Sequence, residues 1–309
     1  MHQFDEHHAE LKGFSSYFHE EIFPFLGMQI SNRQDVINEF KLHAIPITFF
    51  VLAAAIYIGI HEQSFDLPIF SCVIGAIILG AYFQYKIKNV KANIKNLIVE
   101  GICSYLGWAY FAEVTNEPNL NTLSDYYLIP HGFERTSFED QMTGQVHGIE
   151  FQSVEIHLES KVDERWITKF RGQVMTFTFH RKFLGQTVVL RDKGVFQRKE
   201  RGDMKRVGLV DPVFEKIFEA YSTDQVESRY LLDPVVMQKM VDLERILDGK
   251  NIRFGFVAGQ LLIVVQTPNR FEGGSMLKSM TAQERTQKTL DEIGIVYDIV
   301  DAVLAPNAS

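Results

Sequence analysis

Two long apolar stretches decide how this chain is organised. Residues 42–60 read LHAIPITFFVLAAAIYIGI and residues 67–85 read LPIFSCVIGAIILGAYFQY, and each holds 19 residues without Asp, Glu, Lys or Arg. About 20 apolar residues in a helix cross the hydrocarbon core of a bilayer, whereas a buried helix of a soluble protein usually keeps a polar face. We therefore expect a transmembrane hairpin over residues 42–85, in preference to a pair of buried core helices.

The basic residues around these stretches predict how the hairpin is oriented. The connecting segment 61–66 carries Glu62 and Asp66 but no Lys or Arg, while Arg33 and Lys41 precede the first stretch. Four lysines follow the second stretch and are candidates for contact with lipid headgroups: Lys86, Lys88, Lys91 and Lys95. Because Lys and Arg are enriched on the cytoplasmic side, we expect both termini in the cytoplasm and segment 61–66 outside.

The overall composition excludes several classes of protein. The chain has 309 residues, 46% of them hydrophobic, and a formal net charge of −8. This content is too apolar for a disordered chain, and two cysteines are too few for a disulfide scaffold. The acidic total argues against a nucleic-acid binder, because neutralising phosphates requires a basic surface.

The chain outside the apolar stretches is expected to contribute two further parts. Residues 1–41 form an N-terminal cytoplasmic segment, in which residues 3–26 have the apolar spacing of an amphipathic helix. Its opposite face is acidic, which favours packing against the protein's own cytoplasmic domain over lying on a membrane surface. Residues 86–309 form the cytoplasmic domain.

This domain is expected to have an α+β fold with a mainly antiparallel sheet. The helix that begins in the second apolar stretch should continue to about Glu113, and a last helix should cover residues 282–304. Strand-like alternation occurs between them, in residues 146–158, 174–180, 186–190, 252–256 and 260–265. Short turns predict that 174–180 pairs with 186–190 in one hairpin, and that 252–256 pairs with 260–265 in another.

Residues 211–234, DPVFEKIFEAYSTDQVESRYLLDP, predict a series of short, well-capped helices. Asp211 can cap the first helix, Ser222 can open the second, and Asp233 can cap the third. The charged residues of this segment are the best candidates for acid–base chemistry: Glu215, Asp224, Glu227 and Arg229. Helix caps and structural ion pairs explain the same residues without catalysis, and we favour that interpretation.

This segment also resembles a bacterial family of two-pass membrane proteins known as domain of unknown function 3137. The matching pieces are Asp211-Pro212, Phe214-Glu215-Lys216, Phe218, Tyr221-Ser222, Asp224-Gln225-Val226-Glu227, Arg229-Tyr230-Leu231-Leu232 and Pro234. Weaker resemblance extends back to the strand at 174–180. The resemblance implies a location in the bacterial inner membrane and a LemA-type membrane protein as a partner, but it implies no reaction, cofactor or catalytic residue.

A run of positive charge between residues 181 and 206 supplies a second set of candidates for lipid contact. Nine Lys and Arg face three acidic residues here, which gives a local charge of +6. Near an anionic leaflet each basic residue contributes about 1 kcal/mol to binding. The candidates are Arg198, Lys199, Arg201, Lys205 and Arg206. Ordinary solvated turns explain the same run, and we prefer this explanation.

No common catalytic or metal-binding motif is present in the sequence, which has no phosphate loop, GxGxxG, HExxH, CxxC or GxSxG pattern. His147, His157 and His180 lie on expected strands and are interpreted as outward-facing polar residues. We expect no cofactor and no metal. The sequence thus predicts a membrane-anchored scaffold or regulatory protein, with a membrane-bound enzyme and an oligomeric channel as alternatives, and leaves oligomerisation open.

Overall fold

The computed structural model describes residues 3–6, 8–62, 66–179, 182–192, 202–246, 251–266 and 282–304. The chain divides into two compact units, which are described separately below. The helical unit contains Met1–Asp5, Gly13–Gly101 and Glu272–Thr286. The sheet unit contains Glu6–Lys12, Ile102–Phe271 and Gln287–Ser309.

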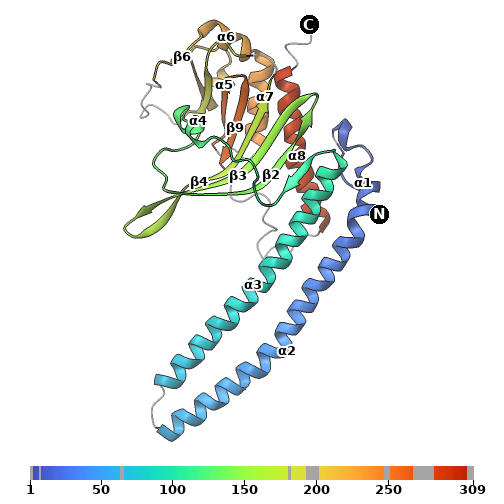
Figure 1. The fold of residues 1–309 in the computed structure, drawn as a ribbon, viewed down its shortest axis with the longest axis vertical. Coiled ribbons are helices and arrows are strands. Elements are labelled where there is room, and N and C mark those ends of the chain that lie inside the picture. The colour runs from blue at the N-terminus through green and yellow to red at the C-terminus, as the bar shows by residue number, and fades with distance from the viewer. Residues whose placement is uncertain are drawn as a thin grey trace. The chain divides into compact units, whose positions relative to one another are not determined.

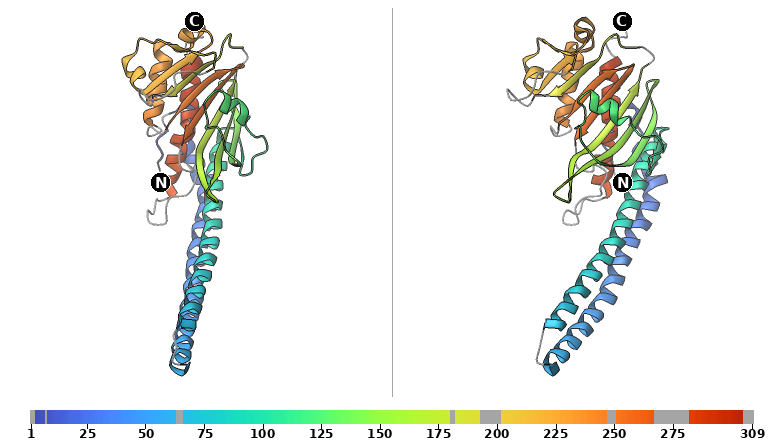
Figure 2. Two further views of the ribbon diagram at one scale, coloured as in Figure 1. Left: turned by 90° about the vertical axis from the view of Figure 1, so that its left-hand side faces the viewer. Right: turned by 60° about the vertical axis from the view of Figure 1, so that its left-hand side comes forward.

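Two helices of 40 residues each dominate the helical unit. They are α2 (Phe23–Glu62) and α3 (Asp66–Tyr105), and they run side by side in opposite directions (Figures 1 and 2). A short helix α1 (Phe14–Tyr17) and a π-helical turn η2 (Phe18–Ile22) precede them. Helix α3 ends at Tyr105, before the predicted Glu113, because the chain turns through Gly107 with a positive φ of 72°.

The N-terminal residues are helical only in part. Residues 3–6 are not helical, and the first turn is the 3-10 helix η1 (Ala9–Leu11), which belongs to the sheet unit. Within the helical unit, Phe4 packs edge-on against Phe14 and Phe18, with ring centroids 5.7 and 4.8 Å apart. Most of the predicted apolar face is therefore buried, but Phe25 at its end is 51% exposed, and the single continuous helix over 3–26 is wrong.

Helix α2 contains a segment long and apolar enough to cross a membrane, Asn38–Tyr57, and it is the one such segment in the described residues. Only 7% of this window is buried, which differs from the core helix of a soluble protein. Helix α3 contributes a shorter apolar stretch, Val73–Tyr82. Large apolar side chains are exposed on both helices, including Phe49, Phe50, Ile77 and Ile78.

In the residues that the structure describes, the sheet unit is built on nine strands that pair antiparallel in the order β1-β2-β3-β4-β9-β8-β5-β7-β6. The strands are β1 (Ala109–Phe111), β2 (Arg135–Val146), β3 (Ile149–Val162), β4 (Arg165–Thr178), β5 (Thr187–Arg191), β6 (Lys205–Val207), β7 (Phe218–Ser222), β8 (Arg253–Val257) and β9 (Gln260–Gln266). Its helices are α4 (Leu120–Asp125), α5 (Pro212–Ile217), α6 (Gln225–Leu231), α7 (Pro234–Ile246) and, from Gln287 on, α8 (Ala282–Leu304). The predicted α+β class and antiparallel sheet are confirmed.

Helices cover both faces of this sheet, with α4 on one face and α7 and α8 on the other (Figure 2). On the α4 face, Leu123 and Leu128 are buried in one cluster with Ile156 of β3 and Val174 of β4. On the other face, Tyr297 of α8 stacks on Trp108, with ring centroids 5.3 Å apart. Burial of apolar side chains on both faces gives the domain its core.

Strand pairing agrees with the sequence in one hairpin and differs in the other. β8 and β9 form the hairpin predicted around residues 258–259, and α8 has the predicted bounds. β4, however, pairs with β3 and β9, while β5 pairs with β7 and β8. The predicted hairpin between 174–180 and 186–190 is therefore wrong.

The segment 211–234 also contains a strand where the sequence predicts helix. Residues 218–222 form β7 between β5 and β6, so Tyr221 lies in the sheet. Ser222 ends this strand, and the N-cap of the next helix is Asp224. Asp211 and Asp233 lie at the helix starts where the sequence places them.

Candidate functional site

The three aspartates of segment 211–234 hold the first turns of its helices. Asp211 Oδ1 accepts hydrogen bonds from the backbone N–H groups of Val213 and Phe214, at 2.8 and 3.0 Å. Asp224 Oδ1 accepts two equivalent bonds at the start of α6, and Asp233 Oδ1 accepts one from Val236 N at 2.9 Å. These carboxylates satisfy backbone donors that a helix start would otherwise leave unpaired.

The two glutamates proposed as acid–base candidates also bind backbone donors. Glu227 accepts from the N–H groups of Leu184 and Gly185 through its two oxygens, at 2.7 and 2.6 Å. Glu215 accepts from Leu209 N at 3.1 Å. Glu227 thus ties the chain before β5 to α6, and a Cβ added at Gly185 would lie 2.6 Å from Cβ of Asp224. The close approach explains why glycine occupies this position.

Arg229, the fourth candidate of this segment, lies exposed on α6. A different pair is formed nearby, where Glu219 of β7 accepts from the Tyr221 hydroxyl at 2.9 Å and lies 3.8 Å from Arg206. Arg191 and Glu244 form another ion pair, between β5 and α7. Among the ion pairs of the described residues, none joins Arg229 to the carboxylates that bind backbone donors.

The basic candidates for lipid contact are only partly placed. Lys205 and Arg206 are exposed on the edge strand β6, and Lys95 is half-buried in α3. Arg198, Lys199 and Arg201 lie outside the described residues. Lys86, Lys88 and Lys91 belong to α3, but their side chains are outside the described set.

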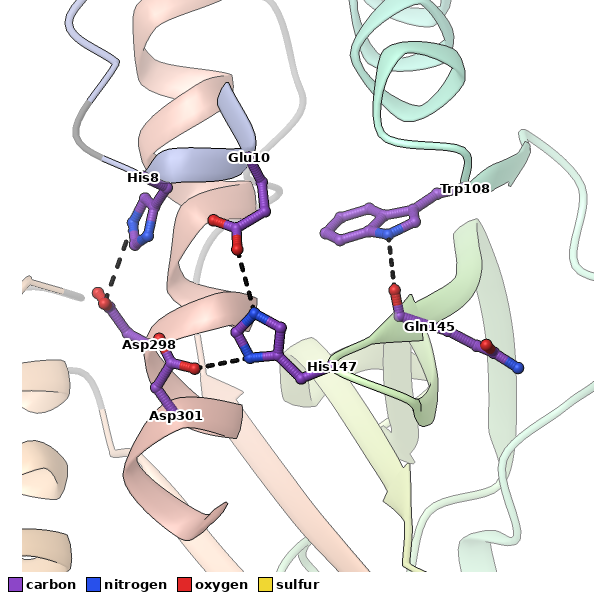
Figure 3. A network of polar contacts seen from close by, with 7 residues as sticks. All are labelled: His8, Glu10, Trp108, Gln145, His147, Asp298 and Asp301. Carbon is purple, nitrogen blue, oxygen red and sulfur yellow. Dashed lines mark hydrogen bonds and ion pairs between the residues drawn. The ribbon is translucent and has the colours of Figure 1, made fainter. Parts of the chain in front are cut away.

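A second group of charged residues, which the sequence did not identify, surrounds His147 (Figure 3). His147 lies in the two-residue turn between β2 and β3. Its Nε2 is 3.1 Å from Glu10 Oε1, and its Nδ1 is 2.8 Å from Asp301 Oδ1. We call His147, Glu10 and Asp301 the histidine clamp, because they join the turn, the N-terminal helix η1 and the C-terminal helix α8.

The surroundings of the clamp favour the charged form of its histidine. The hydrogen bond that the His147 ring donates to Glu10 is the main factor that raises the pKa of His147, and the charge of Asp301 adds to it. Partial burial raises the pKa of Glu10. A backbone hydrogen bond and the contact with His147 lower it by more, so the pKa of Glu10 is lowered overall. Both ring nitrogens donate only in the imidazolium form, so the geometry describes an ion-paired residue and not a free general base.

Further contacts hold the same elements together within the sheet unit. His8 Nε2 lies 4.0 Å from Asp298 Oδ1 of α8, and the indole N–H of Trp108 donates to the Gln145 carbonyl at 3.3 Å (Figure 3). Burial, together with the charge of Glu10, raises the pKa of Tyr297 to about 12. Among the described residues no group of His, Cys, Asp and Glu is arranged to hold a metal ion.

Of the three histidines singled out from the sequence, the structure describes two, and these lie on different elements. His147 lies in a turn and not on a strand, and His157 on β3 is 2.8 Å from the Thr168 hydroxyl. His180 is outside the described residues. The dipeptide His147-Gly148 lies between two segments of alternating apolar residues, and this sequence pattern is typical of a hairpin turn. No sequence signal links it to Glu10 or Asp301, which are far away along the chain.

Fold and site together define an antiparallel α+β domain in which the carboxylates of Asp211, Glu215, Asp224, Glu227 and Asp233 accept hydrogen bonds from backbone N–H groups. Residues 168–304 match the profile of a family described as protein of unknown function (DUF3137), which confirms the resemblance for this part of the chain. No curated protein matches the sequence significantly. Among solved structures, the mycobacterial trehalose monomycolate transport factor A (TtfA) aligns at 14% identity with a TM-score of 0.34. That alignment covers 67% of this chain and 94% of the other.

Proposed function

We propose that this protein is a scaffold or regulatory protein of the bacterial inner membrane, anchored by α2 and α3 and acting through binding. The observation that supports the proposal is that the candidate carboxylates bind backbone N–H groups of the protein itself. Glu227 binds two backbone N–H groups with its two oxygens, and Asp224 caps α6. A general acid or base needs its carboxyl group within hydrogen-bond reach of the substrate, whereas these groups are held by the protein's own backbone.

The anchor is supported by the exposure of apolar side chains on the two long helices. Phe49 and Phe50 of α2 are 77% and 75% exposed, and Ile77 and Ile78 of α3 are 64% and 62% exposed. Exposed apolar surface of this extent is unfavourable in water but matches lipid tails. At 1.5 Å per residue, a 40-residue helix is about 60 Å long, roughly twice the hydrocarbon thickness.

The orientation rests on the charge distribution described above. With segment 61–66 outside, the lysines after residue 85 and the sheet unit lie on the cytoplasmic side. The lipid bilayer is then one partner of the protein. A LemA-type membrane protein, suggested by the family resemblance, is a candidate for the protein partner.

The anchor is tested by labelling introduced cysteines in intact cells with a membrane-impermeant maleimide, in a Cys72→Ser background whose remaining Cys103 is buried. We expect Gln63→Cys to react without permeabilisation and Glu150→Cys, an exposed residue of the sheet unit, to react only after it. The full chain should also stay in the membrane pellet after carbonate extraction. A chain released into the soluble fraction, or the reverse labelling pattern, would contradict the proposed anchor.

The binding role is tested by gentle solubilisation of the full chain from its native membrane and identification of what co-purifies. We expect a membrane protein in near-stoichiometric amount, retained by the Glu227→Gln variant if that variant is folded. The scaffold role is rejected if the purified chain turns over a substrate and folded Glu227→Gln loses this turnover. A chain that purifies alone from every mild detergent also counts against it.

A further inference from the structure

In the part of the chain that the structure describes, a segment of strand β2 has no strand partner on its outer side. β1 pairs only with Gln141–Thr143 of β2, whereas β3 pairs along β2 from Arg135 to Val146. Within the described residues, the five residues 135–139 therefore have a strand partner on one side only. Backbone groups on such an edge can form a ladder with another strand.

The boundary of this open edge is fixed by polar contacts. A register shift separates Glu139 from Met142, and the N–H of Asp140 donates to the Ala112 carbonyl at 3.3 Å. Gln141 Oε1 accepts from Thr115 N at 2.7 Å, which holds the chain after β1 in place. The open edge is consequently a separate five-residue segment, 135–139, with the sequence Arg-Thr-Ser-Phe-Glu.

The side chains of this segment face solvent. Arg135, Thr136, Ser137 and Glu139 are exposed, and Phe138 alone is partly buried against the core. Because side chains alternate along a strand, Arg135, Ser137 and Glu139 lie on one face. One charged residue stands at each end of this face, with Ser137 in the middle.

The two charged residues differ in their neighbours on β3. Arg135 pairs with Glu159, with its Nε 3.6 Å from Glu159 Oε2. Glu139 lies opposite another carboxylate, Glu155, which is bound by Arg171 at 3.0 Å. Among the described residues no cation forms an ion pair with Glu139, and like charges directly opposite are destabilising. A cation on the outer side of Glu139 would relieve this repulsion.

We propose that the open edge of β2 pairs with the same edge of a second copy, antiparallel about a two-fold axis at Ser137. This register places Arg135 of each copy opposite Glu139 of the other, because the two residues are equally far from Ser137. Each copy then supplies the cation that Glu139 lacks. A two-fold interface requires a self-complementary surface, and the order of Arg, Ser and Glu in this segment provides one.

The same geometry limits the strength of the contact. Beyond residue 139 the partner's edge is occupied by its own β1, so the ladder is confined to five residues of each chain. Stable dimers usually bury at least about 1,200 Å² in total, and five residues per strand supply less. The pairing is therefore a reversible contact between copies held at high local concentration. The charges at its ends specify the register and oppose shifted pairings.

Disulfide formation at the proposed axis tests this arrangement in the full chain. In a Cys72→Ser background, Ser137→Cys brings two thiols together on the axis, where paired strands are about 5 Å apart between Cα atoms, within disulfide range. We expect a disulfide-linked dimer from Ser137→Cys under mild oxidation. Gln145→Cys, exposed on the same strand, should remain monomeric because its two copies are about 50 Å apart at 3.3 Å per residue. Equal cross-linking of both variants, or none at Ser137→Cys, would overturn the proposal.

Charge reversal tests the register and distinguishes a second copy from another partner. Arg135→Glu or Glu139→Arg, each added to Ser137→Cys, creates two like-charged pairs and should reduce the disulfide-linked dimer about tenfold. When the two reversed chains are mixed, every cross-pair is again of opposite charge. We expect hetero-linked dimers to form at the original level, while each chain alone stays at the reduced level. If mixing does not restore the disulfide-linked dimer although circular dichroism shows both variants to be folded, the proposed self-pairing is wrong.

Discussion

Replacing His147 by asparagine would separate the two roles of this residue, in the turn and in the histidine clamp. His147 and Gly148 have φ angles of 50° and 79°, as expected for a two-residue turn with both central residues left-handed. Asn-Gly is the preferred pair in such turns. His147→Asn therefore keeps the hairpin and removes the charge that contacts Glu10 and Asp301.

The expected loss of stability follows from the two contacts. The side chains of His147, Glu10 and Asp301 are 42%, 32% and 53% exposed, so solvent screens both pairs. An exposed ion pair contributes roughly 0.2–1 kcal/mol, which gives about 1 kcal/mol for the two together. The preference of asparagine for this turn offsets at most a few tenths of a kcal/mol of this loss.

The sign of the pH dependence follows from the direction of the pKa shift. The pKa of His147 is raised in the folded protein by Glu10 and Asp301. A raised pKa means that the contribution is complete below the unfolded value of about 6.5 and is lost as the pH rises through the folded value. The variant should therefore be less stable than the natural chain at pH 6, and the difference should vanish at high pH.

Amide hydrogen exchange measures this loss of stability in η1, the element that the histidine clamp holds. The N–H groups of Leu11 and Lys12 donate to the carbonyls of His8 and Ala9 at 3.0 and 3.3 Å within η1. A loss of about 1 kcal/mol is roughly a fivefold change in the opening equilibrium, so His147→Asn should accelerate exchange in residues 8–12 about fivefold at pH 6. Above the folded pKa the acceleration should disappear. Glu150→Gln, on the same hairpin, is the control and should change nothing at either pH.

The reasoning is refuted if exchange in residues 8–12 is equally fast in His147→Asn and the natural chain at pH 6. It is also refuted if the acceleration is the same at both pH values. In that case the turn or the packing of η1 would hold the N-terminus, and not the charge of the imidazole.

Three further predictions concern stability and titration. Glu227→Gln should destabilise the chain by about 2 kcal/mol in denaturant unfolding, because a carboxylate that binds two backbone donors is lost; exposed Arg229→Gln should change stability by less than about 0.5 kcal/mol. Gly172→Ala should cost at least about 3 kcal/mol in the same assay, since its Cβ would lie 2.0 Å from a backbone oxygen of β9. Gly208→Ala, with no atom within 4 Å of its Cβ, is the matched control. Spectrophotometric titration should assign to Tyr297 a phenol that ionises near pH 12, and this step should be absent in Tyr297→Phe.

The sequence by itself determined those features that depend on neighbouring residues. The aspartates at 211 and 233 precede proline-started helices, and the structure finds them at helix starts. The hairpin between β8 and β9 and the bounds of α8 also follow from local alternation, turn residues and helical periodicity. Each of these signals is complete within about 25 residues of chain.

Strand partners and the histidine clamp were decided only by the tertiary structure. Alternation identifies residues 174–178 as strand, but nothing local states that their neighbour is β9, which lies more than 80 residues further on. The spacing of Phe214, Phe218 and Tyr221 fits a helix equally well, and only pairing with β5 and β6 makes 218–222 a strand. The clamp joins residues 10, 147 and 301, so no local pattern contains it. The physical reason is that hydrogen bonds between strands and ion pairs depend on distance in space, which the chain sets only after it has folded.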